Sequence, residues 1–124
     1  MATGLENLKI YQMSKYLELK VHEITKDFPR DELYRSVDQL RRSSSSVSNN
    51  IAEAYNKNSI KQKCQILRDI AISEAEETES NLRRCGDKDL LNKETAGTIA
   101  DGYIELKKAI YGYIRFLNRA QLVN

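Results

Sequence analysis

Residues 39–54 read QLRRSSSSVSNNIAEA, a stretch in which four consecutive serines stand close to two consecutive asparagines. Such a run often marks a loop or linker, yet a hydrophobic repeat passes straight through it. The repeat alternates steps of four and three residues, which places its members on one face of a helix. Its members are Leu33, Val37, Leu40, Ser44, Val47, Ile51 and Ala54. The stretch therefore predicts a helix whose surface is small and polar for close packing.

The composition of the chain favours helices. It has 124 residues, of which 31% are charged, with one proline and five glycines. This length suits a single domain over residues 1–124, and the scarcity of helix breakers favours long helices over strands. Lys and Arg number 20 and Asp and Glu number 18, a net charge of +2 that neither demands nor excludes an anionic partner. Because no apolar run reaches the ~20 residues of a membrane span and residues 1–10 lack a signal-peptide pattern, we expect no membrane partner and a cytoplasmic location.

Helix start and stop signals divide the chain into four helices. We expect them at about residues 7–27, 30–55, 59–85 and 93–121. Pro29 disfavours helical geometry at Phe28 and suits the first turn of the next helix. Ser59 and Gln62 form a capping-box pattern, and Gly86 is a typical residue after a helix end. Since short connections make sequential helices antiparallel, the sequence predicts an all-α, up-down-up-down four-helix bundle.

Apolar stripes define the expected core of the other three helices. They comprise Ile10, Met13, Leu17, Val21, Ile24 and Phe28; Ile60, Cys64, Leu67, Ala71, Thr78 and Leu82, interrupted by Glu74; and Ile99, Tyr103, Leu106, Ile110, Tyr113, Leu117 and Ala120. Cys64 and Cys85 lie on one predicted helix, where 21 residues at about 1.5 Å each separate them by roughly 31 Å. A disulfide needs backbones within ~7 Å, so we expect two reduced thiols.

Three motifs follow one another along the second predicted helix. They read FPRDELY at 28–34, QLRR at 39–42 and SVSNNIAE at 46–53, and Ile70-Ala71 with Glu77-x-x-x-x-Leu82 continues the pattern. Together they resemble the ribosomal-RNA intervening-sequence protein family over nearly the whole chain, from about Leu5 to Asn118. The residues that match its motifs, and that the resemblance marks as structural, are Phe28, Pro29, Glu32, Gln39, Ser46, Asn50, Ile51, Ala52, Glu53 and Glu77.

The resemblance implies a cytoplasmic bacterial four-helix bundle that assembles as a ring-like homopentamer. It also implies nucleic-acid binding without enzymatic activity or a cofactor, and a similar fold serves as the accessory protein of retroelement reverse transcriptases. Two departures from the family pattern stand in this chain. Ala54 replaces the glycine that usually follows NIAE, and Ser73-Glu74 replaces a Gly-Ser pair. At these two places, local packing or subunit contacts are expected to differ from those of relatives that carry the usual residues.

Candidate nucleic-acid-binding residues lie on a polar line along the second helix. The line comprises Arg35, Gln39, Arg42, Ser46, Asn49 and Glu53, flanked by Arg41. Guanidinium groups fork onto phosphate oxygens, so Arg35, Arg41, Arg42 and Asn49 are the expected contacts to RNA or DNA. In a five-fold ring each contact would be repeated, which strengthens binding to a polyanion.

A structural alternative stays open for the same arginines, which could pair with Glu53 or Glu77 within or between bundles. A second basic stretch, made of Lys57, Lys61, Lys63 and Arg68, is expected to be solvated surface charge.

Catalytic and metal chemistry find little support in the sequence. A carboxylate dimetal site in a bundle needs Glu from several helices with Glu-x-x-His pairs, whereas Glu74, Glu76, Glu77 and Glu79 share one helix. The single histidine, His22, is expected at the surface. No nucleophile elbow, phosphate-binding glycine loop or Cys-x-x-Cys motif is present.

Two functions from different classes therefore remain. The first is a non-enzymatic, homo-oligomeric RNA- or DNA-binding accessory protein, with a nucleic-acid-processing protein as a further partner. The second is a protein-interaction scaffold that binds a polypeptide partner.

Overall fold

The structure, a computed structural model, describes residues 4–123, and this range is all-helical without a strand. Four long helical segments make up the fold, three of them built from more than one element. Along the chain the elements are α1 (Gly4–Asn7), α2 (Lys9–Thr25), the 3₁₀ turn η1 (Arg30–Glu32), the π-helical turn η2 (Leu33–Val37), α3 (Asp38–Asn56), α4 (Ile60–Ile66), the π-helical turn η3 (Leu67–Ala71), α5 (Ile72–Asp87) and α6 (Lys93–Val123).

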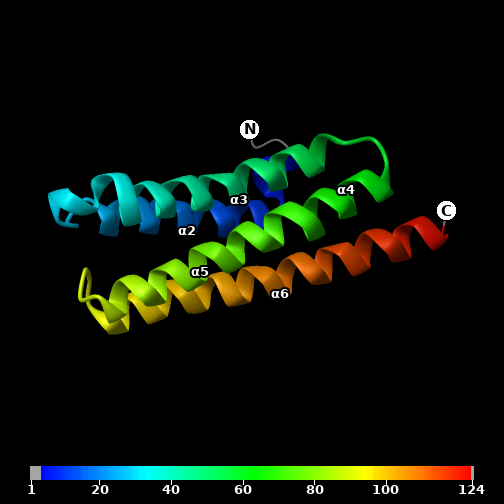
Figure 1. The fold of residues 1–124 in the computed structure, drawn as a ribbon. Helices are drawn as coiled ribbons and strands as arrows, with labels where there is room; N and C mark the ends of the chain where they lie inside the picture. The colour runs from blue at the N-terminus through cyan, green and yellow to red at the C-terminus, as the bar shows by residue number, and fades with distance from the viewer. Residues whose placement is uncertain (1–3, 124) are drawn as a thin grey trace.

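The four segments pack in a closed order around one core. α2 contacts α3 and α6, α3 contacts α5, and α5 contacts α6. Figure 1 shows α2 with α3 and α5 with α6 as two pairs lying side by side. The largest fully buried side chains come from every segment and include Val21, Leu40, Ile51, Leu67, Leu82, Tyr103, Leu106 and Ile110.

The predicted helix over the serine run is confirmed. α3 passes through residues 43–46 without interruption, and Leu40, Val47 and Ile51 are 0% exposed. Ser43, Ser44 and Ser48 are buried with them. Small side chains allow close approach of neighbouring helices, and Thr78 Oγ1 on α5 lies 2.7 Å from Ser43 Oγ in a buried hydrogen bond that joins the two helices.

Leu33 is a correction to the predicted stripe, because its side chain is 45% exposed. It opens the π-helical turn η2, whose hydrogen bonds span five residues instead of four, and this inserted residue shifts the phase of the apolar pattern. η3 has the same effect in the third segment. The core positions Ala71, Ala75 and Thr78 are fully buried, and Ala75 takes the place that the regular repeat would have given to Glu74.

The end of the third segment also differs from the prediction. The helix continues through Gly86 to Asp87, and the left-handed residue that turns the chain is Asp89, with φ of 60°. Gly86 serves close packing instead, because a Cβ built there would lie 3.0 Å from Ala96 Cβ on α6. Asn92 then caps α6, its Oδ1 accepting hydrogen bonds from the backbone amides of Glu94 and Thr95 at 2.8 and 3.2 Å.

Buried groups of the core match several expectations. Cys64 and Cys85 are free thiols, and Cys64 is buried in the predicted stripe; Cys85 is buried as well. The ring of Tyr103 is fully buried, and its hydroxyl has no hydrogen-bond partner among residues 4–123. Burial raises the pKa of this phenol above its usual value. His22 is exposed, as expected.

Candidate functional site

The outward face of α3 carries a shallow polar hollow. Steps of four and three residues put Asp38, Arg42, Ser45 and Asn49 in one row opposite the buried stripe. The hollow has a volume of about 510 Å³. It is lined by Asp38, Arg41, Arg42, Ser45, Ser46, Asn49 and Asn50. Because the serines are short, they form a low floor between the longer arginine and asparagine side chains.

Arg41 stands at one edge of this hollow, where α3 meets the end of α2. Its Nε donates a hydrogen bond to Thr25 Oγ1 at 2.9 Å, and its Nη2 donates to the carbonyl oxygen of His22 at 3.4 Å. These acceptors belong to the last turn of α2, whose free carbonyls favour a positive charge. The guanidinium is therefore fixed in position before any ligand binds.

Arg42 stands nearer the centre of the hollow and is more exposed. Its Nη2 donates to Asp38 Oδ2 at 2.9 Å, one turn earlier on the same helix. Exposed pairs of this kind contribute only about 0.3–0.5 kcal/mol, so a phosphate could compete for the guanidinium. Asp38 is thus the partner of Arg42, whereas the sequence analysis offered Glu53 and Glu77 as partners for the arginines. Glu53 lies 3.8 Å from Lys57, and Glu77 makes no ion pair with an arginine within residues 4–123.

Glu77 lies beside Glu74 on α5. Partial burial of Glu74, together with the negative charge of Glu77 and a hydrogen bond to it, raises the pKa of the Glu74 carboxyl. Neither carboxylate reaches the polar hollow of α3.

The structure brings together some of the predicted binding residues and leaves others apart. Arg41, Arg42 and Asn49 share the hollow, together with the family-motif residues Ser46 and Asn50. Asn50 Nδ2 donates to the carbonyl oxygen and to Oγ of Ser46, at 2.8 and 3.1 Å, which holds this side of the hollow in place.

Arg35 lies outside the hollow, on η2, exposed and without an ion pair in the part of the chain that is described. Gln39 faces a different small cleft between α3 and α5, beside Asn81 and Arg84.

The remaining family-motif residues have mixed surroundings. Phe28 and Ile51 are buried, Ala52 is half-buried, and Pro29 and Glu53 are exposed. Glu32 Oε2 accepts a weak hydrogen bond from Ser36 Oγ at 3.4 Å.

Two residues at this site, and a third at the far end of α3, carry roles that the sequence did not indicate. Thr25 accepts the hydrogen bond that positions Arg41, and Asp38 positions Arg42. Lys63, expected as solvated charge, donates from Nζ to the carbonyl oxygen of Tyr55 at 2.6 Å and so stabilises the end of α3. Only for Asp38 was a signal available, because an acid four residues before an arginine is a typical helical pair.

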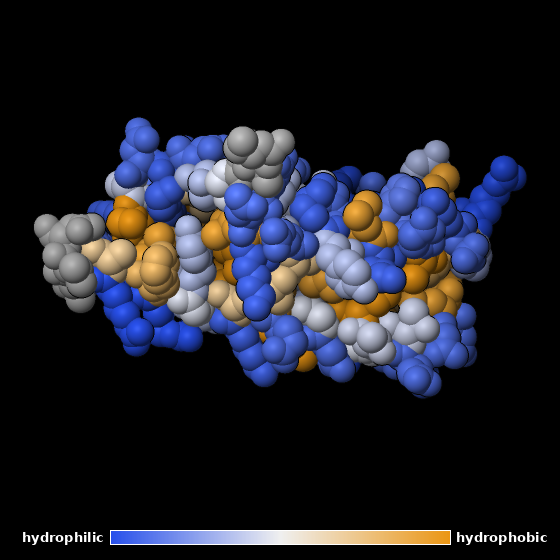
Figure 2. Space-filling view, turned by 180° about the vertical axis from the view of Figure 1, so that it is seen from behind, coloured by the Kyte–Doolittle hydropathy of each residue, from blue (hydrophilic) through white to orange (hydrophobic). Residues whose placement is uncertain are grey.

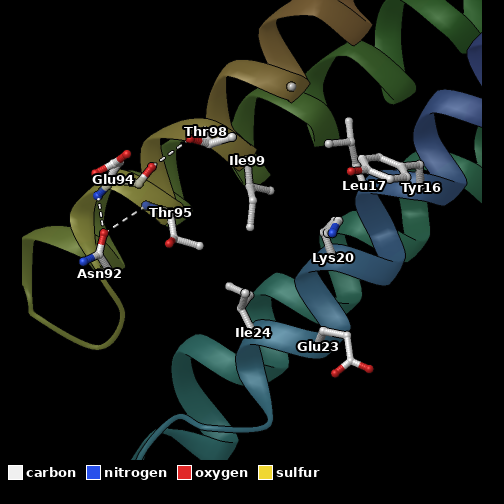
Figure 3. Close-up of a pocket in the computed structure, with 11 residues that line it drawn as sticks. Tyr16, Leu17, Lys20, Glu23, Ile24, Asn92, Glu94, Thr95, Thr98 and Ile99 are labelled. Atoms are coloured by element: carbon white, nitrogen blue, oxygen red, sulfur yellow. Dashed lines mark hydrogen bonds between the residues drawn. The ribbon is translucent and has the colours of Figure 1, made fainter.

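A second hollow of different character lies between α2 and the first turns of α6. It has a volume of about 780 Å³. Figure 3 shows Tyr16, Leu17 and Ile24 of α2 across from Thr98 and Ile99 of α6. Gly102 permits the close approach of the two helices, because a Cβ there would lie 2.6 Å from Leu17 Cδ2. Figure 2 shows hydrophobic residues in a band along one face of the molecule, flanked by hydrophilic side chains.

Residues 4–123 contain neither a metal-binding cluster nor a membrane-spanning helix. No group of three or more His, Cys, Asp and Glu side chains in this range is arranged to hold a metal ion. None of the helices in the same range has an apolar stretch long enough to cross a bilayer.

Comparisons with known proteins agree with the motifs on α3. No curated protein matches the chain. One solved structure is described as a protein of unknown function from the S23 ribosomal protein family of Bacteroides thetaiotaomicron. It superposes with a TM-score of 0.75 at 25% sequence identity, and the match covers 85% of this chain and 97% of that one. The family model of the 23S rRNA-intervening sequence protein matches residues 6–112. This span contains the polar hollow and all the motifs described above. The chain therefore belongs to the 23S rRNA-intervening sequence protein family.

Proposed function

We propose that the protein is a non-enzymatic, homo-oligomeric accessory protein that binds RNA or DNA through the arginine-lined face of α3. The observation that carries this proposal is the polar hollow, in which Arg41 and Arg42 flank a floor of small hydroxyl and amide side chains. One guanidinium group can donate two parallel hydrogen bonds to the oxygens of a phosphate. Serine and asparagine side chains add neutral hydrogen bonds to the same phosphate oxygens. These contacts go to the nucleic-acid backbone, so the protein is expected to read little base sequence.

The proposed particle is a ring-like homopentamer of antiparallel, up-down-up-down four-helix bundles. The colour gradient in Figure 1 supports this topology, since it reverses direction from each long segment to the next. The hollow between α2 and α6 supports self-association, because Tyr16 and Ile24 present apolar surface there beside charged side chains, and exposed apolar surface rimmed by polar residues commonly marks interfaces. A ring would present five copies of the arginine hollow, and their combined contacts would bind a polyanion more tightly than one copy could.

The test removes the two guanidinium groups that line the hollow. In the double variant Arg41→Ala/Arg42→Ala we expect weaker binding of structured RNA and duplex DNA, measured by fluorescence anisotropy. The slope of log affinity against log salt should fall by about two for each engaged copy, because each lost phosphate contact removes about one released counterion.

A matched control separates this effect from a general loss of charge. Arg68 and Arg115 are exposed and make no ion pair within residues 4–123. The double variant Arg68→Ala/Arg115→Ala removes the same charge away from the hollow and should bind nearly as the wild type does. Light scattering on both variants checks that the oligomer is intact. Equal affinities for the two double variants would remove the α3 face from the proposal.

A protein-interaction scaffold is the second candidate, and the hollow between α2 and α6, with its exposed Tyr16, favours it. In this case a polypeptide partner, such as a nucleic-acid-processing protein, would cover Tyr16, which is 60% exposed. A pull-down from a nuclease-treated lysate tests this function with the wild type and with Tyr16→Ala. Retention of one partner by the wild type and its loss in the variant would favour the scaffold.

A further inference from the structure

A third hollow lies at the end of the molecule where α2 turns into η1 and η2. Its volume is about 280 Å³, near the small end of the ~300–1,000 Å³ range of ligand pockets. The floor is apolar and comes from Phe28, Pro29, Leu33 and Val37. Phe28 and Val37 are 8% and 4% exposed and belong to the core, whereas Pro29 and Leu33 are open to solvent. A flat apolar group of modest size could therefore lie on this floor.

The rim of the same hollow is cationic. Lys26, Arg30 and Arg41 line it, and no carboxylate does. Arg30 is exposed and makes no ion pair in the described part of the chain, and Lys26 has only an exposed pair with Glu23 at 3.3 Å. Asp27 and Asp31 are exposed neighbours in sequence that do not line the hollow. The occupant that fits is thus apolar on one side and negatively charged on the other.

Arg41 connects this hollow with the polar hollow on α3, because it lines both of them. From Arg41 the polar hollow continues to Asn49, which is eight residues or about 12 Å further along the helix. A succession of anion-binding groups over this length fits a chain with repeated negative charges better than a ligand with a single charge. Continuity with the phosphate-binding face thus favours a nucleic acid as the occupant.

The π-helical turn η2 explains why an apolar side chain is available there. In a regular helix Leu33 would join the buried stripe with Val37 and Leu40, but the extra residue in the turn moves it outward, to the exposed part of the apolar floor. Leu33 therefore supplies apolar surface to the turn end of the molecule, next to the exposed ring of Pro29.

We propose that this hollow, which we name the turn hollow, holds an unpaired nucleobase of single-stranded RNA or DNA. The base lies on Pro29 and Leu33, its phosphate is bound by Arg30 and Arg41, and the strand continues over the polar hollow. This inference rests on the proposed nucleic-acid binding and deepens it, since it states that the protein prefers nucleic acids with unpaired nucleotides. Duplex ends or junctions with a single-stranded tail would then be preferred over blunt duplex.

The test compares three fluorescent probes by anisotropy on the intact protein. They are a blunt duplex, the same duplex with a short single-stranded tail, and the same duplex with an abasic tail that keeps the phosphates but lacks the bases. We expect the tail with bases to bind about 5-fold more tightly than the abasic tail, because a base on Pro29 and Leu33 removes on the order of 40 Å² of apolar surface from water. Repeating the tail in DNA and in RNA separates the two sources of the base.

Variants assign the effect to the turn hollow. Leu33→Ala should lower the ratio between the two tails to about 2-fold or less, whereas Leu19→Ala, an exposed leucine on α2 outside the hollow, should leave the ratio unchanged. Arg30→Ala should weaken both tailed probes by a similar factor, because it removes a contact to phosphate. Circular dichroism and light scattering check that each variant keeps its fold and assembly.

The outcomes separate this inference from the function on which it rests. If the two tails bind equally while Arg41→Ala/Arg42→Ala still weakens every probe, the base site is refuted and the proposed function stands. If Leu19→Ala lowers the ratio as much as Leu33→Ala does, the base binds elsewhere and the assignment to the turn hollow is refuted. If the wild type binds none of the probes, both proposals are refuted.

Discussion

The two faces of α3 use the same residue type for opposite purposes. On the buried face, Ser43, Ser44 and Ser48 are at most 3% exposed and allow neighbouring helices to approach closely. On the outward face, Ser45 and Ser46 remain partly exposed and form the floor of the polar hollow. The difference follows from the 100° turn between successive helical residues, which sends adjacent serines to different surroundings. Helical phase, not composition, therefore decides what each serine does.

The largest expected effect is a direct test of this comparison. Ser44→Leu forces a larger side chain into a site that is 1% exposed and should lower the free energy of unfolding by about 3 kcal/mol. Ser45→Leu makes the same chemical change one residue later, on the partly exposed face, and should stay within about 0.5 kcal/mol of the wild type. Urea unfolding measures both. Equal losses of stability in the two variants would mean that the faces do not differ as described.

A smaller effect concerns the polar contact on the buried face. Thr78→Val keeps the shape of the side chain but removes the hydroxyl that meets Ser43 Oγ at 2.7 Å. The loss should be about 1 kcal/mol, because Ser43 Oγ loses its short hydrogen bond to Thr78 and keeps only the longer one to the carbonyl oxygen of Leu40 at 3.4 Å. Ser73→Ala removes an exposed hydroxyl that lies five residues earlier on α5 and serves as the control. If both substitutions have the same small effect, the hydrogen bond between α3 and α5 contributes nothing specific to stability.

The smallest expected effect is a difference in stability between variants of Arg41, at the edge of the outward face, and of Arg42, nearer its centre. Arg41→Ala should cost about 1 kcal/mol of stability, since Arg41 joins α3 to the last turn of α2 through Thr25 and His22. Arg42→Ala breaks only an exposed pair with Asp38 and should cost less than about 0.5 kcal/mol. Thermal unfolding of the two single variants compares them. A larger cost for Arg42 than for Arg41 would contradict the assigned contacts.

Much of the fold was predictable from periodicity. The helix through the serine run and the start of α6 at Lys93 were predicted, and so was the burial of Tyr103. Each of these depends on an apolar repeat that continues over several turns. The two π-helical turns were not predicted, because their trace in the sequence is a shift in the phase of the apolar stripe, seen only as the interruption at Glu74. Leu33 was therefore assigned to the core, although it lies on the surface.

The candidate site was predictable only in part, for a related reason. Arg41, Arg42 and Asn49 share a helix, so their common face follows from spacing. The contact of Arg41 with Thr25 joins residues 16 positions apart, and only the packing of α2 on α3 shows it. The turn hollow likewise combines side chains from α2, the turn after it and both π-helical and α-helical parts of the next segment. Hollows of this kind depend on tertiary neighbours, which a pattern within one helix does not contain.

The two buried cysteines give this molecule a pair of built-in chemical reporters. Cys64 and Cys85 stand near opposite ends of the segment formed by α4, η3 and α5, and each is at most 5% exposed. A thiol reagent can modify either one only when its own end of the segment opens. The two labelling rates, resolved by mass spectrometry, would therefore show which end of the native protein breathes more often, without any engineered probe.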